Sequence, residues 1–270
     1  MFTVEVTLPS SKKRRIAELK NRDYVNIIKF CENNDLYGLS SLFDELYLDK
    51  DLDIYDRFYI LIYVRMLFVG ETLTYVTEDN KNIDIGLDTV LQKLDENFKD
   101  LDTEITIDDI KIQLGLPNCI YFKDVDDLLT AVIKSVTINN KSIGFNKLTS
   151  QEKSQVIGKL PARAFSYIYS FLNKISDELL NVTVVQQNDN FGIKEINVSI
   201  IGNGVMQFIL NIYRVDIKSY YELIYMFFQK IFPGTTEFYN ISPIESRIML
   251  NIHNKRIVDE NKELKKQQKQ

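Results

Sequence analysis

One apolar run constrains the fold of this chain more than any other part of its sequence. Residues 58–69 are apolar except for Arg65. A helix needs about 20 apolar residues to cross a bilayer, so this run is too short to span a membrane. Its composition is also too apolar for a surface segment. We therefore predict a buried core helix over about 55–68 that ends at Gly70, because glycine commonly follows the last turn of a helix.

The remaining sequence alternates helical and extended patterns, which predicts a helix-dominated α+β fold. Two pairs of extended runs flank turn residues, so we predict small antiparallel hairpins near 72–85 and 182–201. Residues 3–8 and 104–114 alternate polar and apolar side chains, as half-buried strands do. Two capping boxes, at Thr149 and Ser242, predict helix starts. Further helices are expected at about 21–33, 38–47, 88–98, 124–135 and 161–174, and almost throughout from 205 to about 265.

Charge is unevenly distributed along the chain. Residues 44–130 carry 8 basic and 21 acidic side chains, a net charge of −13, whereas the whole chain carries −5. This asymmetry favours oriented docking to partners or to other parts of the same chain. A polar stretch at 136–148 indicates a soft boundary between an N-terminal α+β lobe (1–135) and a C-terminal lobe (149–270). The second lobe would be helical, with a hairpin and a long final helix; a single domain is the alternative.

The composition excludes the common classes of enzyme site. His253 is the only histidine, which rules out metal sites that need two imidazoles. Cys31 and Cys119 are too few for a disulfide framework. The ten glycines form neither of the common phosphate-binding loops, and an acidic turn at 49–53 lacks the later positions of a calcium loop. We therefore predict a protein that is not an enzyme and has no cofactor or metal; an enzyme would need a carboxylate cluster made only by folding.

The densest basic cluster consists of Lys12, Lys13, Arg14 and Arg15. It is expected in a loop between a strand and a helix, where it is either solvated or contacts phosphate or an acidic protein surface. A nucleic-acid-binding protein usually presents an extended basic face, and the rest of this chain is acidic overall. A protein partner, or none, is therefore favoured over nucleic acid.

Two C-terminal helices are the predicted partner contacts. The helix expected over 217–230 carries apolar side chains on nearly all sides, which places it in the core or in an interface, and the core is the commoner case. Aromatic residues are nonetheless typical of interface centres. The final helix carries an apolar stripe. The candidate contact residues are Tyr221, Tyr225, Phe228, Ile248 and Ile252.

Several stretches of the chain follow one another in a recognisable order. They are Val6–Ser10 with the basic segment after it, Asp56–Glu71, Leu148–Glu152 leading to Leu160 and Pro161, and Ser242–Arg247 with Asp259–Asn261 further on. In pattern and order these stretches resemble the baseplate hub assembly family of T4-type contractile-tailed phages. Residues 104–135 are the least similar part.

The resemblance implies a phage-encoded late protein, without enzymatic activity, that helps to assemble the baseplate hub. Its expected partners are hub or tape-measure subunits, with no membrane partner and with oligomer formation left open. It would act in the host cytoplasm during virion assembly as a chaperone-like factor. One alternative is a permanent structural subunit of the tail baseplate in the virion. The other is a nucleic-acid-binding protein that uses residues 12–15.

Overall fold

The apolar run forms helix α3 (Ile54–Phe68), which is buried along most of its length and only partly buried at Tyr63 and at 65–67. Asp53 caps its start, because its carboxylate accepts hydrogen bonds from the backbone N–H groups of Tyr55 and Asp56. The helix stops before Gly70, whose φ of 155° is in a region that favours glycine. The predicted core helix and its stop signal are therefore confirmed. Among the described residues, no helix has the length and apolarity to cross a membrane.

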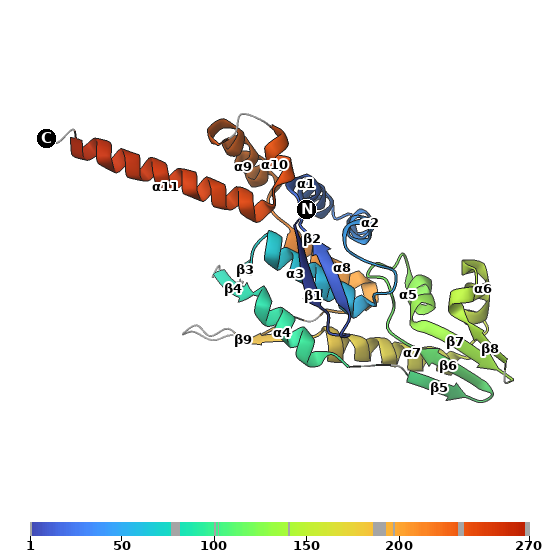
Figure 1. Cartoon of the computed structure of the whole chain (residues 1–270). Helices are drawn as coiled ribbons and strands as arrows, with labels where there is room; N and C mark the ends of the chain where they lie inside the picture. The colour runs from blue at the N-terminus through green and yellow to red at the C-terminus, as the bar shows by residue number, and fades with distance from the viewer. Residues whose placement is uncertain are drawn as a thin grey trace.

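The structure is a computed structural model that describes residues 2–76, 82–99, 101, 103–139, 141–185, 193–196, 198–231 and 235–267. Its fold is α+β and helix-dominated, as predicted. The other long helices are α1 (Asn21–Glu32), α2 (Leu36–Leu46), α4 (Leu87–Asn97), α5 (Val125–Val132), α6 (Ser150–Ile157), α7 (Ala162–Lys174), α8 (Gly204–Tyr213), α9 (Ile217–Lys230) and α11 (Pro243–Gln267). Among them, α4, α8 and α11 pack against α3, whereas α6 packs against α5 on one side of the molecule (Figure 1).

Short helical segments complete the chain: η1 (Phe145–Lys147), the π-helical turn η2 (Ile175–Leu180), η3 (Ile201–Asn203) and α10 (Thr235–Asn240). Both predicted capping boxes are present. The Thr149 side chain and Glu152 satisfy each other's backbone N–H groups at α6. At α11, Ser242 N–H donates to Glu245 Oε2 over 2.8 Å, and Glu245 N–H donates to Ser242 Oγ over 3.4 Å.

Two predicted hairpins are confirmed as antiparallel pairs. β3 (Thr72–Val76) pairs with β4 (Asn82–Gly86), and β9 (Val182–Val185) pairs with β10 (Ile193–Ile196). The predicted turn residues, 79–81 and 188–192, lie outside the described residues. The sequence prediction was incomplete, because a four-stranded antiparallel sheet is also present. It has the order β5 (Thr103–Ile107), β6 (Ile110–Leu114), β7 (Ile133–Ile138), β8 (Lys141–Gly144).

Two local predictions were wrong. The helix expected over 124–135 ends at Val132, because Ile133 begins β7 and pairs with Leu114 of β6. The basic cluster was expected in a loop, but residues 13–15 lie in β2 (Lys13–Ala17), which pairs with β1 (Thr3–Thr7). The stretch 136–148 holds the end of β7, β8 and η1. The division into two lobes stays a prediction.

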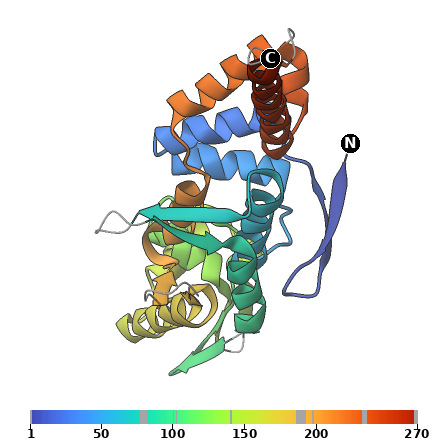
Figure 2. The ribbon, with the colours of Figure 1, turned by 90° about the vertical axis from the view of Figure 1, so that its left-hand side faces the viewer.

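The hairpin β1–β2 lies along one side of the molecule, next to α3 (Figure 2). Ser10, in its turn, donates a hydrogen bond through Oγ to Asp56 Oδ2 over 2.6 Å. Asp56 is fully buried on α3, so this bond gives a buried carboxylate one of the polar partners that it needs. The hairpin is thus attached to the core helix through the buried carboxylate of Asp56.

The substitution Phe58→Ala tests the central role of α3. The Phe58 ring is fully buried and packs edge-on against Phe208 of α8, with 5.4 Å between ring centroids. We expect the free energy of unfolding to fall by about 3–5 kcal/mol, because truncation leaves a cavity in the core. Urea denaturation followed by circular dichroism measures the change. Tyr167→Ala on α7, where the side chain is 55% exposed, is the control, with an expected change within about 0.5 kcal/mol. Equal losses in both variants would contradict the assignment.

Candidate partner-binding surfaces

The basic cluster is largely paired with carboxylates of the same chain. Lys12 Nζ lies 3.6 Å from Asp56 Oδ2 and also donates to the backbone oxygen of Asp51 over 2.9 Å. Arg14 forms ion pairs with Asp49, at 3.5 Å from its Nε, and with Asp51. The acidic turn at 49–53 therefore holds the hairpin onto the protein.

The other two cations of the cluster are more exposed. Lys13 Nζ lies 3.7 Å from Glu5 Oε1 on the neighbouring strand. Arg15 is exposed and has no ion-pair partner in the part of the chain that the structure describes. Exposed ion pairs contribute about 0–1 kcal/mol each, so the pairs made by Lys13 and Arg14 add little to the stability of the hairpin. They nevertheless lower the positive charge that the cluster presents to a partner.

Helix α9 has one face in the core and one face in solvent. Tyr220, Ile224 and Phe227 are buried at helical spacing. Tyr221 and Tyr225, which were candidate contact residues, are 46% and 62% exposed. The sequence left open whether this helix belongs to the core or to a surface, and the structure shows that it belongs to both.

The candidate Phe228 differs from these two tyrosines. Its side chain is half-buried, and its ring packs against Phe238 of α10 with 5.6 Å between centroids. The Phe227 ring also packs against Phe238, with 5.1 Å between centroids. Phe228 therefore contributes to an aromatic cluster that joins α9 to α10, and it presents less surface to a partner than Tyr225 does.

Helix α11 extends away from the rest of the protein beyond its first turns (Figure 1). Leu250 is buried, whereas Ile248 and Ile252 are 51% and 65% exposed. Because residues four apart lie on the same side of a helix, these two isoleucines form an exposed apolar stripe. His253, expected to be half-exposed, has intermediate burial. The stripe is the largest departure from normal burial in this helix.

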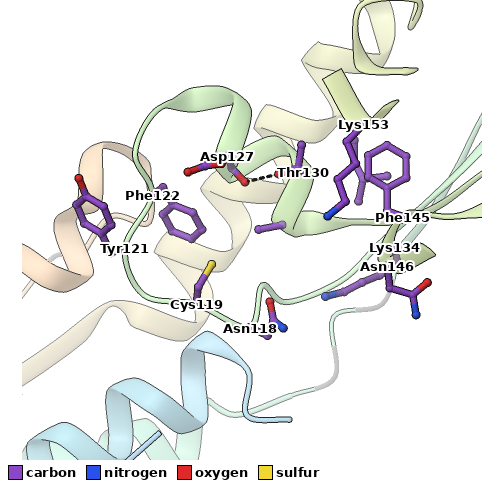
Figure 3. Close-up of a pocket in the computed structure, with 12 residues that line it drawn as sticks. Asn118, Cys119, Tyr121, Phe122, Asp127, Thr130, Lys134, Phe145, Asn146 and Lys153 are labelled. Atoms are coloured by element: carbon purple, nitrogen blue, oxygen red, sulfur yellow. Dashed lines mark hydrogen bonds between the residues drawn. The ribbon is translucent and has the colours of Figure 1, made fainter. Parts of the chain in front are cut away.

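A polar cavity of about 490 Å³ lies between α5, α6 and the start of the β7 strand (Figure 3). Lys134 of β7 and Lys153 of α6 point into it, and Cys119 lines its wall. Burial raises the pKa of the Cys119 thiol to about 11, so the sulfur is protonated and poorly nucleophilic at neutral pH. The geometry is suited to holding a small polar group.

Sequence reasoning missed this cavity. Its lysines are 19 positions apart and come from a strand and a helix, so no spacing in the sequence connects them. The adjacent carboxylates at 108–109 and 126–127, all of them described residues, form no metal site. Among the described residues, no three His, Cys, Asp or Glu side chains are grouped to hold a metal ion.

These features define a class: a helix-dominated α+β protein that exposes apolar and aromatic side chains on two C-terminal helices. Residues 1–201 match the family described as T4 bacteriophage base plate protein, and the chain belongs to this family. The match includes the first three of the stretches that carry the resemblance, while Ser242–Arg247 lies beyond it. In the comparisons with curated proteins and with solved structures, nothing matches the chain.

Alkylation of the two cysteines tests the chemistry of the thiols. Burial raises the pKa of Cys31 to about 12 and that of Cys119 to about 11. At pH 8 each thiolate is therefore scarce, and we expect iodoacetamide to react at least about 100-fold more slowly than with free cysteine. The rate should rise with pH, and Cys119 should react before the more deeply buried Cys31.

Intact-mass spectrometry over time follows the alkylation. The same protein in urea at the same pH is the control, because unfolding removes the burial that raises both pKa values and should restore fast labelling. A native Cys119 that reacts as fast as free cysteine would contradict the protonated thiol.

Proposed function

We propose that this protein is a non-enzymatic assembly factor for the baseplate hub, which binds hub or tape-measure subunits during tail construction. Membership of the T4 base plate protein family supports a role in the baseplate. The resemblance of the four sequence stretches to hub assembly proteins supports the finer assignment. In this role the protein covers apolar surfaces of its partner in the host cytoplasm and then leaves.

The exposed stripe on α11 is the observation that carries this proposal. Ile248 and Ile252 are more than half exposed on a helix that extends into solvent. Burying an apolar side chain of this size is worth about 1.5–3 kcal/mol, so covering the stripe with a partner is favourable. An apolar helix face that docks on a partner is a recurring mode of recognition.

The exposed face of α9 provides a second contact. Tyr221 and Tyr225 are aromatic side chains with polar tips, a type enriched at interfaces. Glu222 lies between them in sequence and is also exposed. This face therefore combines apolar area with hydrogen-bonding groups, as the aromatic residues at the centre of an interface do.

The basic hairpin has a smaller part in this proposal. Because Lys12, Lys13 and Arg14 pair with carboxylates of the chain itself, Arg15 is left as the cation for an acidic partner surface. The same pairing weakens the alternative of nucleic-acid binding, which requires free cations along a phosphate backbone.

Two measurements separate an assembly factor from a permanent baseplate subunit. The first is a pull-down from infected cells with a tag at the N-terminus, so that α11 stays free. The second is quantitative mass spectrometry of purified virions. An assembly factor should capture hub or tape-measure subunits and be nearly absent from virions, whereas a structural subunit should be stoichiometric in them. Capture of neither class of subunit would contradict both roles.

The variants Ile252→Ala and Tyr225→Ala test the two proposed contact surfaces. Residues at the centre of an interface often contribute about 2 kcal/mol or more, so we expect each variant to lower capture of the partner by roughly tenfold or more. The thermal midpoint of the isolated protein should stay unchanged, because both side chains are exposed.

Tyr167→Ala is the matched control for Tyr225→Ala, since Tyr167 is 55% exposed on α7, away from the proposed contacts. It should retain full capture. Wild-type capture by both Ile252→Ala and Tyr225→Ala would refute these surfaces as the contact.

A further inference from the structure

A small cavity lies where α1, α9 and the start of α11 come together. Its volume is about 220 Å³. Val215, Leu223 and Pro243 give it apolar walls, and Tyr24 and Arg247 contribute polar groups. Neither the family match nor the proposed assembly role assigns any function to this cavity.

The hydroxyl of Tyr24 lacks a hydrogen-bond partner among the described residues, although the side chain is only 2% exposed. Its ring packs edge-on against Tyr220, with 5.5 Å between centroids. The Tyr220 hydroxyl, in contrast, donates to Asn21 Oδ1 over 3.0 Å. A buried polar group without a partner costs about 1–3 kcal/mol. The Tyr24 hydroxyl is therefore a hydrogen-bond donor that an added acceptor would stabilise.

Two guanidinium groups, those of Arg65 and Arg247, act electrostatically on this hydroxyl. Arg65 donates through Nε to the backbone oxygen of Ile212 over 2.8 Å and through Nη1 to that of Gly70 over 2.5 Å. Arg247 donates through Nη2 to the backbone oxygen of Val69 over 2.8 Å. Within the described part of the chain, neither arginine forms an ion pair with a carboxylate.

The two arginines approach each other at Gly70. A Cβ atom placed on Gly70 would lie 3.4 Å from Arg65 Nη1 and 3.5 Å from Arg247 Nη1. Burial lowers the pKa of Arg65, and the like charge of Arg247 lowers it further. Both cations also act electrostatically on the Tyr24 hydroxyl. The two cations thus lie near each other, and both act on a hydroxyl that has no hydrogen-bond partner among the described residues.

We propose that this cavity binds a carboxylate carried by a short apolar chain. One carboxylate oxygen accepts the hydrogen bond of the Tyr24 hydroxyl, and the negative charge is paired with Arg247, which lines the cavity. The apolar chain lies against Val215 and Leu223. The apolar walls favour an alkyl carboxylate over inorganic phosphate, which has no apolar part to bury.

The protonation of Tyr24 is consistent with this role. Burial raises the pKa of its hydroxyl to about 12, despite the opposing effect of the two arginines. The hydroxyl is therefore a proton donor throughout the neutral range. A carboxylate is an acceptor without a proton of its own, and hydrogen bonds to charged acceptors are the strong class.

Isothermal titration calorimetry of the full chain with isovalerate tests the proposal, with isovaleramide as its uncharged analogue. We expect saturable binding of isovalerate and none of the amide. Tyr24→Phe and Arg247→Gln should each weaken isovalerate binding by about tenfold or more, because each removes a hydrogen bond or ion pair to a charged group.

Arg256→Gln is the matched control. Arg256 lies on the same helix and pairs with Glu260 at 2.9 Å, away from the cavity, so its loss should leave the affinity unchanged. Tyr24→Phe should not lower the thermal midpoint of the unliganded protein, because the hydroxyl has no partner to lose. Arg247 is exposed, so Arg247→Gln keeps the test valid if the Tyr24 variant folds poorly.

A second pair of probes distinguishes the source of the carboxylate. Acetyl-alanyl-leucine with a free C-terminus represents the chain end of another protein, and its C-terminal amide is the control. Tighter binding of the peptide acid than of isovalerate assigns the cavity to a protein chain end, and equal binding assigns it to a small acid. Equal binding of acid and amide, or isovalerate binding unaffected by both Tyr24→Phe and Arg247→Gln, would overturn the proposal.

Discussion

The nearly complete burial of α3 is the constraint on which the rest of this structure depends. A helix that is buried along most of its length must be covered by other elements, so α4 and α8 pack against it directly and α1 and α2 pack against α8. The polar residues of the buried helix then need partners of their own. Asp56 is bonded by Ser10, and Arg57 donates to the backbone oxygens of Leu52 and Asp49 and to the carboxylate of Asp44. The core helix therefore fixes the N-terminal hairpin and the acidic turn as well as the apolar core.

Features that are set by local sequence were predictable. The core helix, the stop at Gly70 and both capping boxes depend on residues within one or two turns of each other. Strand β2 was not predictable in this way. Its first three residues, one lysine and two arginines, are not typical strand formers. They become extended because they pair with β1 across a turn in which Ser11 has a φ of 62°. Strand β7 follows α5 with no glycine or proline between them. The change from helix to strand at Ile133 therefore depends on pairing with β6, which the local sequence does not reveal.

The same distinction applies to the candidate surfaces. Helical periodicity places Tyr220 and Tyr225 on different faces of α9, but it does not say which face is in the core. In the structure Tyr220 is on the core side, where its hydroxyl donates a hydrogen bond to Asn21 Oδ1. The charge pattern indicated that the acidic middle would attract basic segments, either of a partner or of the chain itself. That Arg14 meets Asp49 and Asp51 follows from folding, because more than 30 residues separate them in sequence. The cavities at Lys153 and at Tyr24 are likewise assembled from distant elements.

Helix α11 depends on contacts with the rest of the protein in its first turns and on local interactions in its later turns. Its first turns are held by the capping box at Ser242 and by the bond from Arg247 to Val69, and they end near Leu250, which is buried. From Ile252 onward the helix depends on its own backbone hydrogen bonds and on pairs such as Arg256 with Glu260. A long single helix is only marginally stable without packing, so a partner that covers the stripe also stabilises the helix. In the proposed role, binding through this segment would bury surface that does not belong to the core, and it would leave the packing around α3 intact.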